Sequence, residues 1–148
     1  MPFDFQLRGL LRLRKIYEQR ERMRLMVLNA SRGRVRAEID ETASRREREF
    51  EALERRLEAG MAAEDVQLEE ASLQLTYRRQ QELVKLIEAL DLQVSKQVEV
   101  FWESQKKRKV IESVRERQWK AYRLIEERRE QQALDDLFAQ RLETQSEP

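Results

Sequence analysis

The sequence predicts an all-α fold, a long antiparallel two-helix coiled-coil hairpin with a protruding C-terminal helix. Charged residues make up 40% of the 148 residues, a fraction typical of long helices. The chain has only three Gly, and its two prolines are Pro2 and Pro148, so no proline interrupts the residues between them. An apolar repeat in the second half alternates steps of four and three residues, which favours a coiled-coil seam.

The first helix is expected over residues 7–58. Only Gly9 and Gly33 weaken it, and an isolated Gly costs about 1 kcal/mol relative to Ala in a helix interior. The apolar stripe of this segment is sparse, and it consists of Val35, Ile39, Phe50, Leu53 and Leu57.

A turn is expected over residues 59–64. Gly60 follows the last apolar position of the first helix, and Gly adopts the left-handed conformation that ends helices. Glu64 and Asp65 then place negative charge where the next helix begins, which complements the helix dipole. The alternative is one uninterrupted helix.

The second helix is expected over residues 65–142, followed by a polar tail over 143–148. Polar residues on its seam cost stability, but they can fix the register of the pairing. Gln80 and Asp91 are the two such residues. The seam as predicted consists of Leu73, Tyr77, Gln80, Val84, Ile87, Asp91, Val94, Val98 and Phe101.

Folding the chain back at the turn pairs positions whose numbers sum to about 125, such as Ile39 with Leu86 and Phe50 with Leu75. The second arm is longer than the first, by about 39 Å at a rise of 1.5 Å per residue. The end of the second helix is therefore expected to protrude alone from a single domain over residues 1–148.

The charge is segregated along the chain. Residues 1–36 carry 10 basic and 3 acidic side chains, and residues 106–129 carry 10 and 4, whereas residues 37–76 carry 5 and 12. The hairpin would bring both basic segments together, which favours an acidic partner surface. The candidate partner-binding residues are Arg8, Arg12, Arg14, Lys107, Arg108, Arg115 and Arg117.

The aromatic residues divide into two groups. Phe50, Tyr77 and Phe101 fall on the predicted seams and are expected in the core. Trp102, Trp119 and Tyr122 lie near or beyond the end of the short arm, where exposed aromatic side chains favour protein binding, and Trp119 and Tyr122 are added to the candidate site. Alternatively, the N-terminal side chains cover them, namely Phe3, Phe5 and Leu7.

Several function classes are disfavoured. The chain has no Cys and no His, so thiolate nucleophiles, zinc fingers and the commonest general base are missing. A helical hairpin offers no dry pocket for catalysis, so neither an enzyme nor a cofactor or metal site is expected. The longest aliphatic run, Leu25–Leu28, is far too short to cross a membrane, and a soluble cytoplasmic protein is expected. The basic run Lys106–Lys109 lacks the motifs of nucleic-acid readers, so nucleic acid is not expected as a partner.

Both ends of the chain carry distinctive motifs. The N-terminal segment with an aromatic residue and a Leu-Leu-x-Leu-Arg pattern reads Phe3-Asp4-Phe5-Gln6-Leu7-Arg8-Gly9-Leu10-Leu11-Arg12-Leu13-Arg14-Lys15. The C-terminal segment reads Glu130-Gln131-Gln132-Ala133-Leu134-Asp135-Asp136, followed by Ala139 and Arg141. Both segments resemble the ends of the bacterial flagellar export protein family FliJ. Chain length, the central Gly60-Met61-Ala62 turn and the basic second helix also agree with that family, so the resemblance covers essentially the whole chain.

The resemblance implies a non-catalytic stalk that binds the hexameric ATPase of the flagellar type III export apparatus. Its other implied partners are the membrane export gate and the export chaperones. The implied location is the cytoplasmic face of the inner membrane at the flagellar base, without insertion into the membrane. Family members often carry gate-contacting aromatic residues shortly after the turn, but residues 66–71 have none, so Tyr77 is the candidate for that contact.

Three other functions compete with this one. A structural scaffold could form from one uninterrupted helix that dimerises as a parallel coiled coil, with twice the 17.9 kDa mass of the chain. The equivalent stalk of a virulence secretion system would share the hairpin. A basic nucleic-acid binder would show steeply salt-dependent binding to unrelated duplexes.

Overall fold

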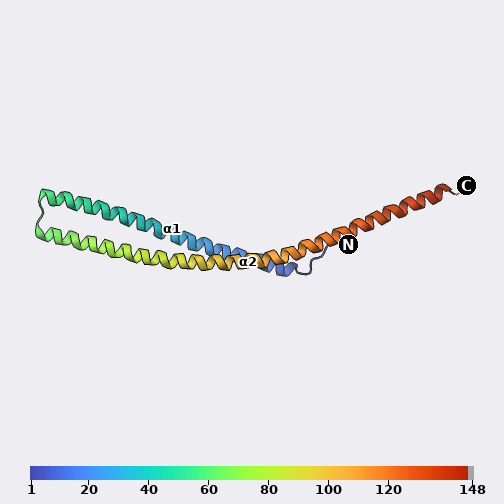
Figure 1. The fold of residues 1–148 in the computed structure, drawn as a ribbon, viewed down its shortest axis with the longest axis horizontal. Helices are drawn as coiled ribbons and strands as arrows, with labels where there is room; N and C mark the ends of the chain where they lie inside the picture. The colour runs from blue at the N-terminus through green and yellow to red at the C-terminus, as the bar shows by residue number, and fades with distance from the viewer. Residues whose placement is uncertain (147–148) are drawn as a thin grey trace. The chain divides into compact units, whose positions relative to one another are not determined.

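The computed structural model describes residues 1–146 and contains two helices, α1 (Arg8–Ala59, 52 residues) and α2 (Ala63–Ser146, 84 residues). The helices pack against each other as a helical hairpin, and the described residues include no strand (Figure 1). The predicted all-α hairpin is confirmed at this level.

The turn lies where the sequence places it. Gly60 has a φ of 95°, in the left-handed region, and its N–H donates to the carbonyl of Leu57 at 3.2 Å. α1 begins and ends one residue later than predicted, and the turn shortens to residues 60–62. α2 extends four residues past its predicted end, so most of the predicted polar tail is helical; residues 147–148 of that tail lie outside the described residues.

The chain divides into two compact units. The hairpin unit is Gln19–Trp102, and the terminal unit combines Met1–Glu18 with the part of α2 that begins at Glu103. Each helix contributes to both units.

In the hairpin unit, α2 faces α1 through residues that recur at strict steps of three and four. The predicted seam is confirmed at every second position, Leu73, Gln80, Ile87, Val94 and Phe101. Three of the four alternate positions were predicted one residue too late, whereas the predicted Val98 is half-buried, as is Gln97 before it. The observed seam of α2 consists of Val66, Glu69, Leu73, Thr76, Gln80, Leu83, Ile87, Leu90, Val94, Gln97 and Phe101.

This shift has a simple origin. Tyr77, Val84 and Asp91 are exposed, and the residue before each of them faces α1 instead. Starting from Leu73, a seam can continue with a step of four residues and then three, or with a step of three and then four. The two seams have every second position in common. In the sequence, only the apolar content of the remaining positions distinguishes one seam from the other. Leu83 and Val84 are both apolar, so the sequence does not decide between them. In the structure Leu83 is the most buried of the described residues, and this fixes the register.

α1 contributes a seam with the same spacing. Val35, Ile39 and Leu53 lie on it as predicted, whereas Phe50 and Leu57 are exposed and each follows a seam residue by one position. The predicted core position of Phe50 is therefore wrong, and Leu75, its neighbour in the predicted register, is also more than half exposed. The α1 seam positions are Glu21, Leu25, Leu28, Arg32, Val35, Ile39, Thr42, Arg46, Glu49, Leu53 and Arg56. Arg46 and Arg56 are exposed at these positions, and they contact α2 through hydrogen bonds to Gln80 and Glu69.

Polar pairs link the two helices along this thin seam. Their position numbers sum to within eight of the predicted 125, which confirms the antiparallel register. The hydrogen bond to Glu38 raises the pKa of the Arg79 guanidinium above its ordinary value. The pairs are Arg32–Asp91 (3.4 Å), Arg46–Gln80 (3.2 Å), Arg56–Glu69 (2.7 Å), Arg79–Glu38 (2.8 Å) and Gln97–Glu21 (2.6 Å).

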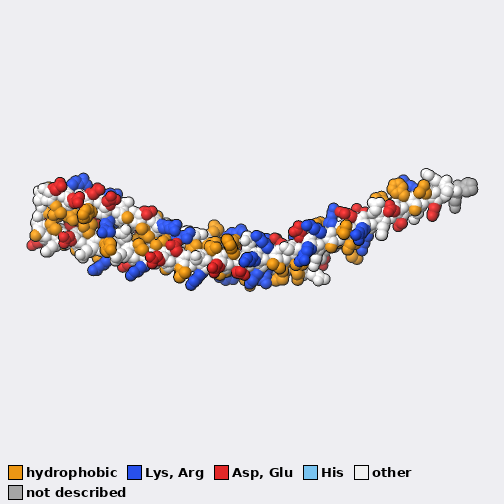
Figure 2. Space-filling view, in the orientation of Figure 1, with side chains coloured by type: hydrophobic (Ala, Val, Ile, Leu, Met, Phe, Trp, Pro, Cys, Tyr) orange, Lys and Arg blue, Asp and Glu red, His pale blue; other side chains and the backbone are white. Residues whose placement is uncertain are grey.

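Much of the apolar surface is left open. Only five apolar side chains are buried among the described residues, and large apolar side chains are exposed on both helices. The space-filling view shows them as separate patches between the charged side chains (Figure 2). Two helices alone cannot cover more, because a hairpin buries only one stripe of each helix.

Candidate protein-binding surface

The terminal unit is built by the N-terminal segment, residues 1–7, which lies against α2. The N–H of Arg8 donates to the carbonyl of Phe5 at 3.0 Å, so the segment turns directly into α1. Phe5 and Leu11 are buried, and both line a hollow together with Arg115 of α2. The Tyr122 hydroxyl donates to the Met1 carbonyl, which ties the start of the segment to α2.

An aromatic cluster forms where this segment meets α2. The Phe3 ring lies 5.2 Å from the Trp119 ring, at an interplanar angle of 73°, and 5.5 Å from the Tyr122 ring. Trp119 and Tyr122 stack at 5.7 Å. The sequence left two alternatives for Trp119 and Tyr122, exposure for protein binding or cover by the N-terminal side chains. The structure shows part of each, because Phe3 packs on both rings while Trp119 remains 43% exposed.

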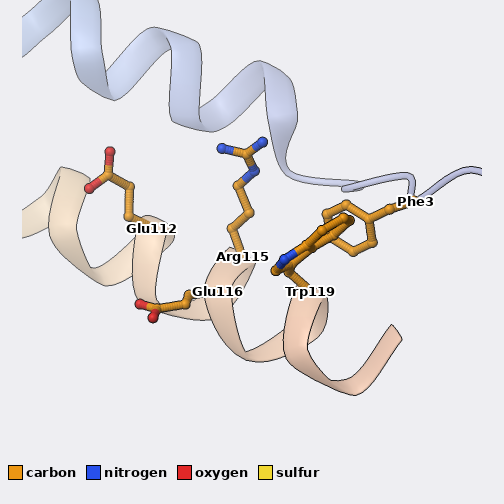
Figure 3. A pocket seen from close by; sticks show the side chains of 5 residues that line it. All are labelled: Phe3, Glu112, Arg115, Glu116 and Trp119. Carbon is orange, nitrogen blue, oxygen red and sulfur yellow. The ribbon is translucent and has the colours of Figure 1, made fainter. Parts of the chain in front are cut away.

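Two hollows flank the Phe3 ring. The first, of about 400 Å³, is lined by Phe3, Glu112, Arg115, Glu116 and Trp119. Figure 3 shows the Phe3 ring against Trp119 and the Arg115 side chain directed toward α1. The second, of about 270 Å³, is lined by Phe3, Phe5, Arg8, Leu11, Arg12, Lys15 and Arg115. Phe3 and Arg115 thus belong to both hollows.

The second hollow is strongly cationic. Arg8 lies 3.4 Å from Asp4, and Lys15 lies 3.9 Å from Glu112. Within residues 1–146, Arg12 and Arg115 have no carboxylate at ion-pair distance. Their exposed guanidinium groups are open to a carboxylate from another molecule, which they can bind through two parallel hydrogen bonds.

A buried ion pair lies beneath this surface on the seam. Glu18 is buried and accepts a hydrogen bond from Arg108 Nε, while Arg108 Nη1 donates to Glu112 Oε2 at 2.6 Å. The hydrogen bond to Glu18 raises the pKa of the Arg108 guanidinium, and burial opposes this effect. Glu112 also lies near Lys15, so the network connects the seam to the cationic hollow.

The predicted site residues fall into three groups. The structure brings Arg8, Arg12, Arg115, Trp119 and Tyr122 together around Phe3. Arg14 and Arg108 lie on the seam, and Arg14 Nε is buried without a hydrogen-bond partner among the described residues. Lys107 and Arg117 are exposed on α2 but line neither hollow, and Tyr77 lies in the hairpin unit.

Sequence reasoning missed Lys15 and Glu112 as parts of this surface. Lys15 belongs to the same basic N-terminal segment as Arg8 and Arg12. It follows Arg12 by one helical turn and so lies on the same face, and this spacing is a signal in the sequence that would have added it to the site. Glu112 is an acidic residue within a mostly basic stretch of α2. A single carboxylate among basic side chains indicates an ion pair within the protein, and this would have identified Glu112.

A second exposed surface lies near the turn, in the hairpin unit. Four large apolar side chains there each follow a seam residue by one position, so they lie on the same flank of the two helices. Arg36 and Asp91 occupy equivalent positions on this flank and form an ion pair at 3.8 Å across it. Tyr77 packs its ring against the Arg46 guanidinium, 4.7 Å away. The four side chains of this turn-proximal flank are Phe50, Leu57, Tyr77 and Val84.

Neither helix, over the residues described, has a stretch apolar and long enough to cross a bilayer. The same residues contain no group of three acidic side chains placed to hold a metal ion. No family model, curated protein or solved structure matches the chain. The fold alone therefore places it, among helical hairpins, and its open surfaces suit the binding of other proteins.

Proposed function

We propose that this protein is a FliJ-like component of the flagellar type III protein export apparatus. In this role it is a non-catalytic coiled-coil stalk that binds the hexameric export ATPase, links it to the membrane export gate and handles export chaperones. It works in the cytoplasm at the base of the flagellum. The resemblance of both ends of the chain to that family and the helical hairpin support the proposal.

The exposed end of α2 is the observation that carries it. Every residue from Glu127 to Ser146 is exposed, although the segment is helical throughout. Apolar side chains spaced three and four residues apart lie on one face of this segment, namely Leu134, Leu137, Phe138 and Leu142. A long helical segment that presents an unpartnered apolar face suits insertion into the central opening of a ring.

The aromatic and cationic cluster supplies the second ATPase contact in this proposal. Arg8, Arg12 and Arg115 would bind carboxylates of the ring, while Phe3 and Trp119 would contact apolar side chains beside them. Charge attraction at such a surface accelerates association and permits release, as a transient contact requires.

The turn-proximal flank is the proposed gate contact. Tyr77, the sequence candidate for that contact, is 45% exposed and has Phe50, Leu57 and Val84 on the same flank. In this proposal Phe50 on α1 takes the part of the aromatic residues that the chain lacks directly after the turn.

The test is stimulation of a purified flagellar export ATPase by the purified chain. We expect stimulation, and we expect it to be lost when Arg12, Arg115 and Arg117 are changed to Glu. The matched control changes three exposed acidic residues of the hairpin unit, Glu41, Glu54 and Glu58, to Lys, and it should retain most of the stimulation. No stimulation by the unmodified chain, or equal loss in both triple variants, contradicts the proposal.

A homodimeric scaffold is the main competitor. Light scattering distinguishes the two, because the stalk is a monomer of 17.9 kDa and the scaffold has twice that mass.

A further inference from the structure

A third hollow, of about 610 Å³, lies on α1 within the hairpin unit. Met23 and Val27 line it with more than half of each side chain exposed, and Leu28 lines it from the seam side. Methionine is flexible and polarizable, and it adapts to the shapes of different apolar partners. Arg20, Arg24 and Gln97 complete the lining.

This apolar strip is separate from the seam. Arg20, Met23 and Val27 follow one another at steps of three and four, so they share one face of α1. The seam residues of the same stretch are Glu21, Leu25 and Leu28, which turn toward α2. α2 therefore leaves the strip of Met23 and Val27 uncovered.

The surroundings of the strip are positively charged. Residues 19–36 contain six Arg and one acidic residue, Glu21. Both carboxylate oxygens of Glu21 are engaged, one by the Gln97 amide at 2.6 Å and the other by Arg24 at 3.0 Å. The Gln97 amide also donates to the Glu21 backbone carbonyl at 3.1 Å. The single acidic side chain thus offers little negative charge to a molecule that approaches the strip.

We propose that this hollow is a docking site for an amphipathic helix of a partner protein, with apolar residues at three- and four-residue spacing and carboxylates on both flanks. The apolar side chains of the helix pack on Met23 and Val27, and its carboxylates pair with Arg20 and Arg24. Charge complementarity selects an acidic helix over a basic one. This site is independent of the export function proposed above, because it uses neither the aromatic cluster nor the end of α2.

The experiment uses two synthetic helical peptides of about 18 residues, which span about 27 Å. They share one Leu and Met face and carry either Glu or Lys on its flanks. Binding to the full chain is measured by fluorescence anisotropy. We expect the Glu-flanked peptide to bind at least about tenfold more tightly, with an affinity that falls as salt rises.

The chain offers a matched pair of variants. Val27 and Met26 are adjacent apolar residues with exposed fractions of 62% and 58%, but only Val27 lines the hollow. Val27→Glu should weaken binding of the Glu-flanked peptide about tenfold or more, while Met26→Glu should change it less than about twofold. Changing Arg20 and Arg24 to Glu should reverse the preference toward the Lys-flanked peptide. Helical circular dichroism confirms that each variant is folded.

Three results overturn the proposal. They are binding of neither peptide, equal binding of both peptides, and equal effects of Val27→Glu and Met26→Glu. Sedimentation of the chain alone supplies a further check. Self-association that Val27→Glu abolishes would make a second copy the occupant, in place of a partner helix.

Discussion

The ion pair between Glu18 and Arg108 gives the sharpest prediction about the stability of the terminal unit. The Glu18 side chain is 6% exposed and the Arg108 side chain 19%, so both charges lie largely out of water. We expect Glu18→Ala to destabilise the terminal unit, because it leaves the Arg108 guanidinium on the seam without its buried partner.

The magnitude follows from what remains after the substitution. A hydrogen bond to a charged group contributes about 1.5 to 3 kcal/mol, and removing one member of a fully buried pair costs about 3 to 5 kcal/mol. Arg108 retains its ion pair with Glu112 at 2.6 Å, so its charge is not left unpaired. We therefore expect Glu18→Ala to lower the free energy of unfolding by about 2 kcal/mol, the value for one charged hydrogen bond rather than for a whole buried pair. The control is Glu112→Ala. Its side chain is 38% exposed, and we expect a loss below about 1 kcal/mol.

The pH dependence of Arg108 has a definite sign. Its pKa is raised in the folded state, so the stability that this cation contributes is fully present below the ordinary pKa of arginine and is lost as the pH rises from there through the raised value. The difference between the Glu18→Ala variant and the unmodified chain should therefore stay constant between about pH 7 and about pH 10.

In a Trp102→Phe background Trp119 is the single tryptophan. Urea unfolding followed by its fluorescence then measures the free energy of unfolding in this unit, with circular dichroism as the global signal. Replacing both Glu18 and Arg108 by Leu should restore stability to within about 1 kcal/mol of the unmodified chain, or raise it. Leu11 and Leu25 occupy the seam positions one heptad before and after Glu18, so Leu fits there. A Glu18→Ala loss no larger than that of Glu112→Ala would refute the reasoning.

Three further predictions concern single residues. Gly33→Ala should stabilise the chain by about 0.5 to 1 kcal/mol in thermal unfolding, whereas Gly60→Ala should destabilise it by about 1 kcal/mol. Both sites have space for a methyl group, but of the two only Gly60 has a positive φ. Equal effects of the two substitutions would contradict the turn geometry. Glu49→Leu should raise the free energy of urea unfolding by about 1 to 2 kcal/mol, because Glu49 Oε2 is buried and has no hydrogen-bond partner among the described residues; a loss of stability would show that the carboxylate is satisfied. In a Trp102→Phe background, Phe3→Ala should shift Trp119 emission to longer wavelength, and an unchanged spectrum would show that the Phe3 ring does not cover the indole.

The sequence predicts the hairpin well because its strongest signals are local. Gly60 ends a long segment without other breakers, and the acidic residues after it mark a helix start, so the turn and the register near 125 follow from short stretches. The choice between Leu83 and Val84 on the seam is different, since it depends on which of two adjacent apolar residues meets α1. That choice is made by packing against the other helix, which periodicity alone does not contain.

The candidate surface was predicted in part. The convergence of Arg12 and Arg115 follows from the charge blocks once the hairpin is assumed, and Trp119 follows from its place beyond the first arm. Arg108 looks like any other member of its basic run, yet it lies on the seam, because it falls at the same repeat position as Val94 and Phe101. Charged residues on the surface can be told from charged residues on the seam only when the heptad register is assigned correctly.

The most direct test of the hairpin is an intramolecular distance between Glu38 and Arg79. These residues are 41 positions apart and form a 2.8 Å hydrogen bond across the two helices. The chain has no Cys, so two introduced cysteines can carry spin labels without background. The structure predicts a label separation below about 25 Å in a monomer, whereas one uninterrupted helix would separate these positions by about 62 Å. A long distance within one molecule would contradict the fold and the functions proposed from it.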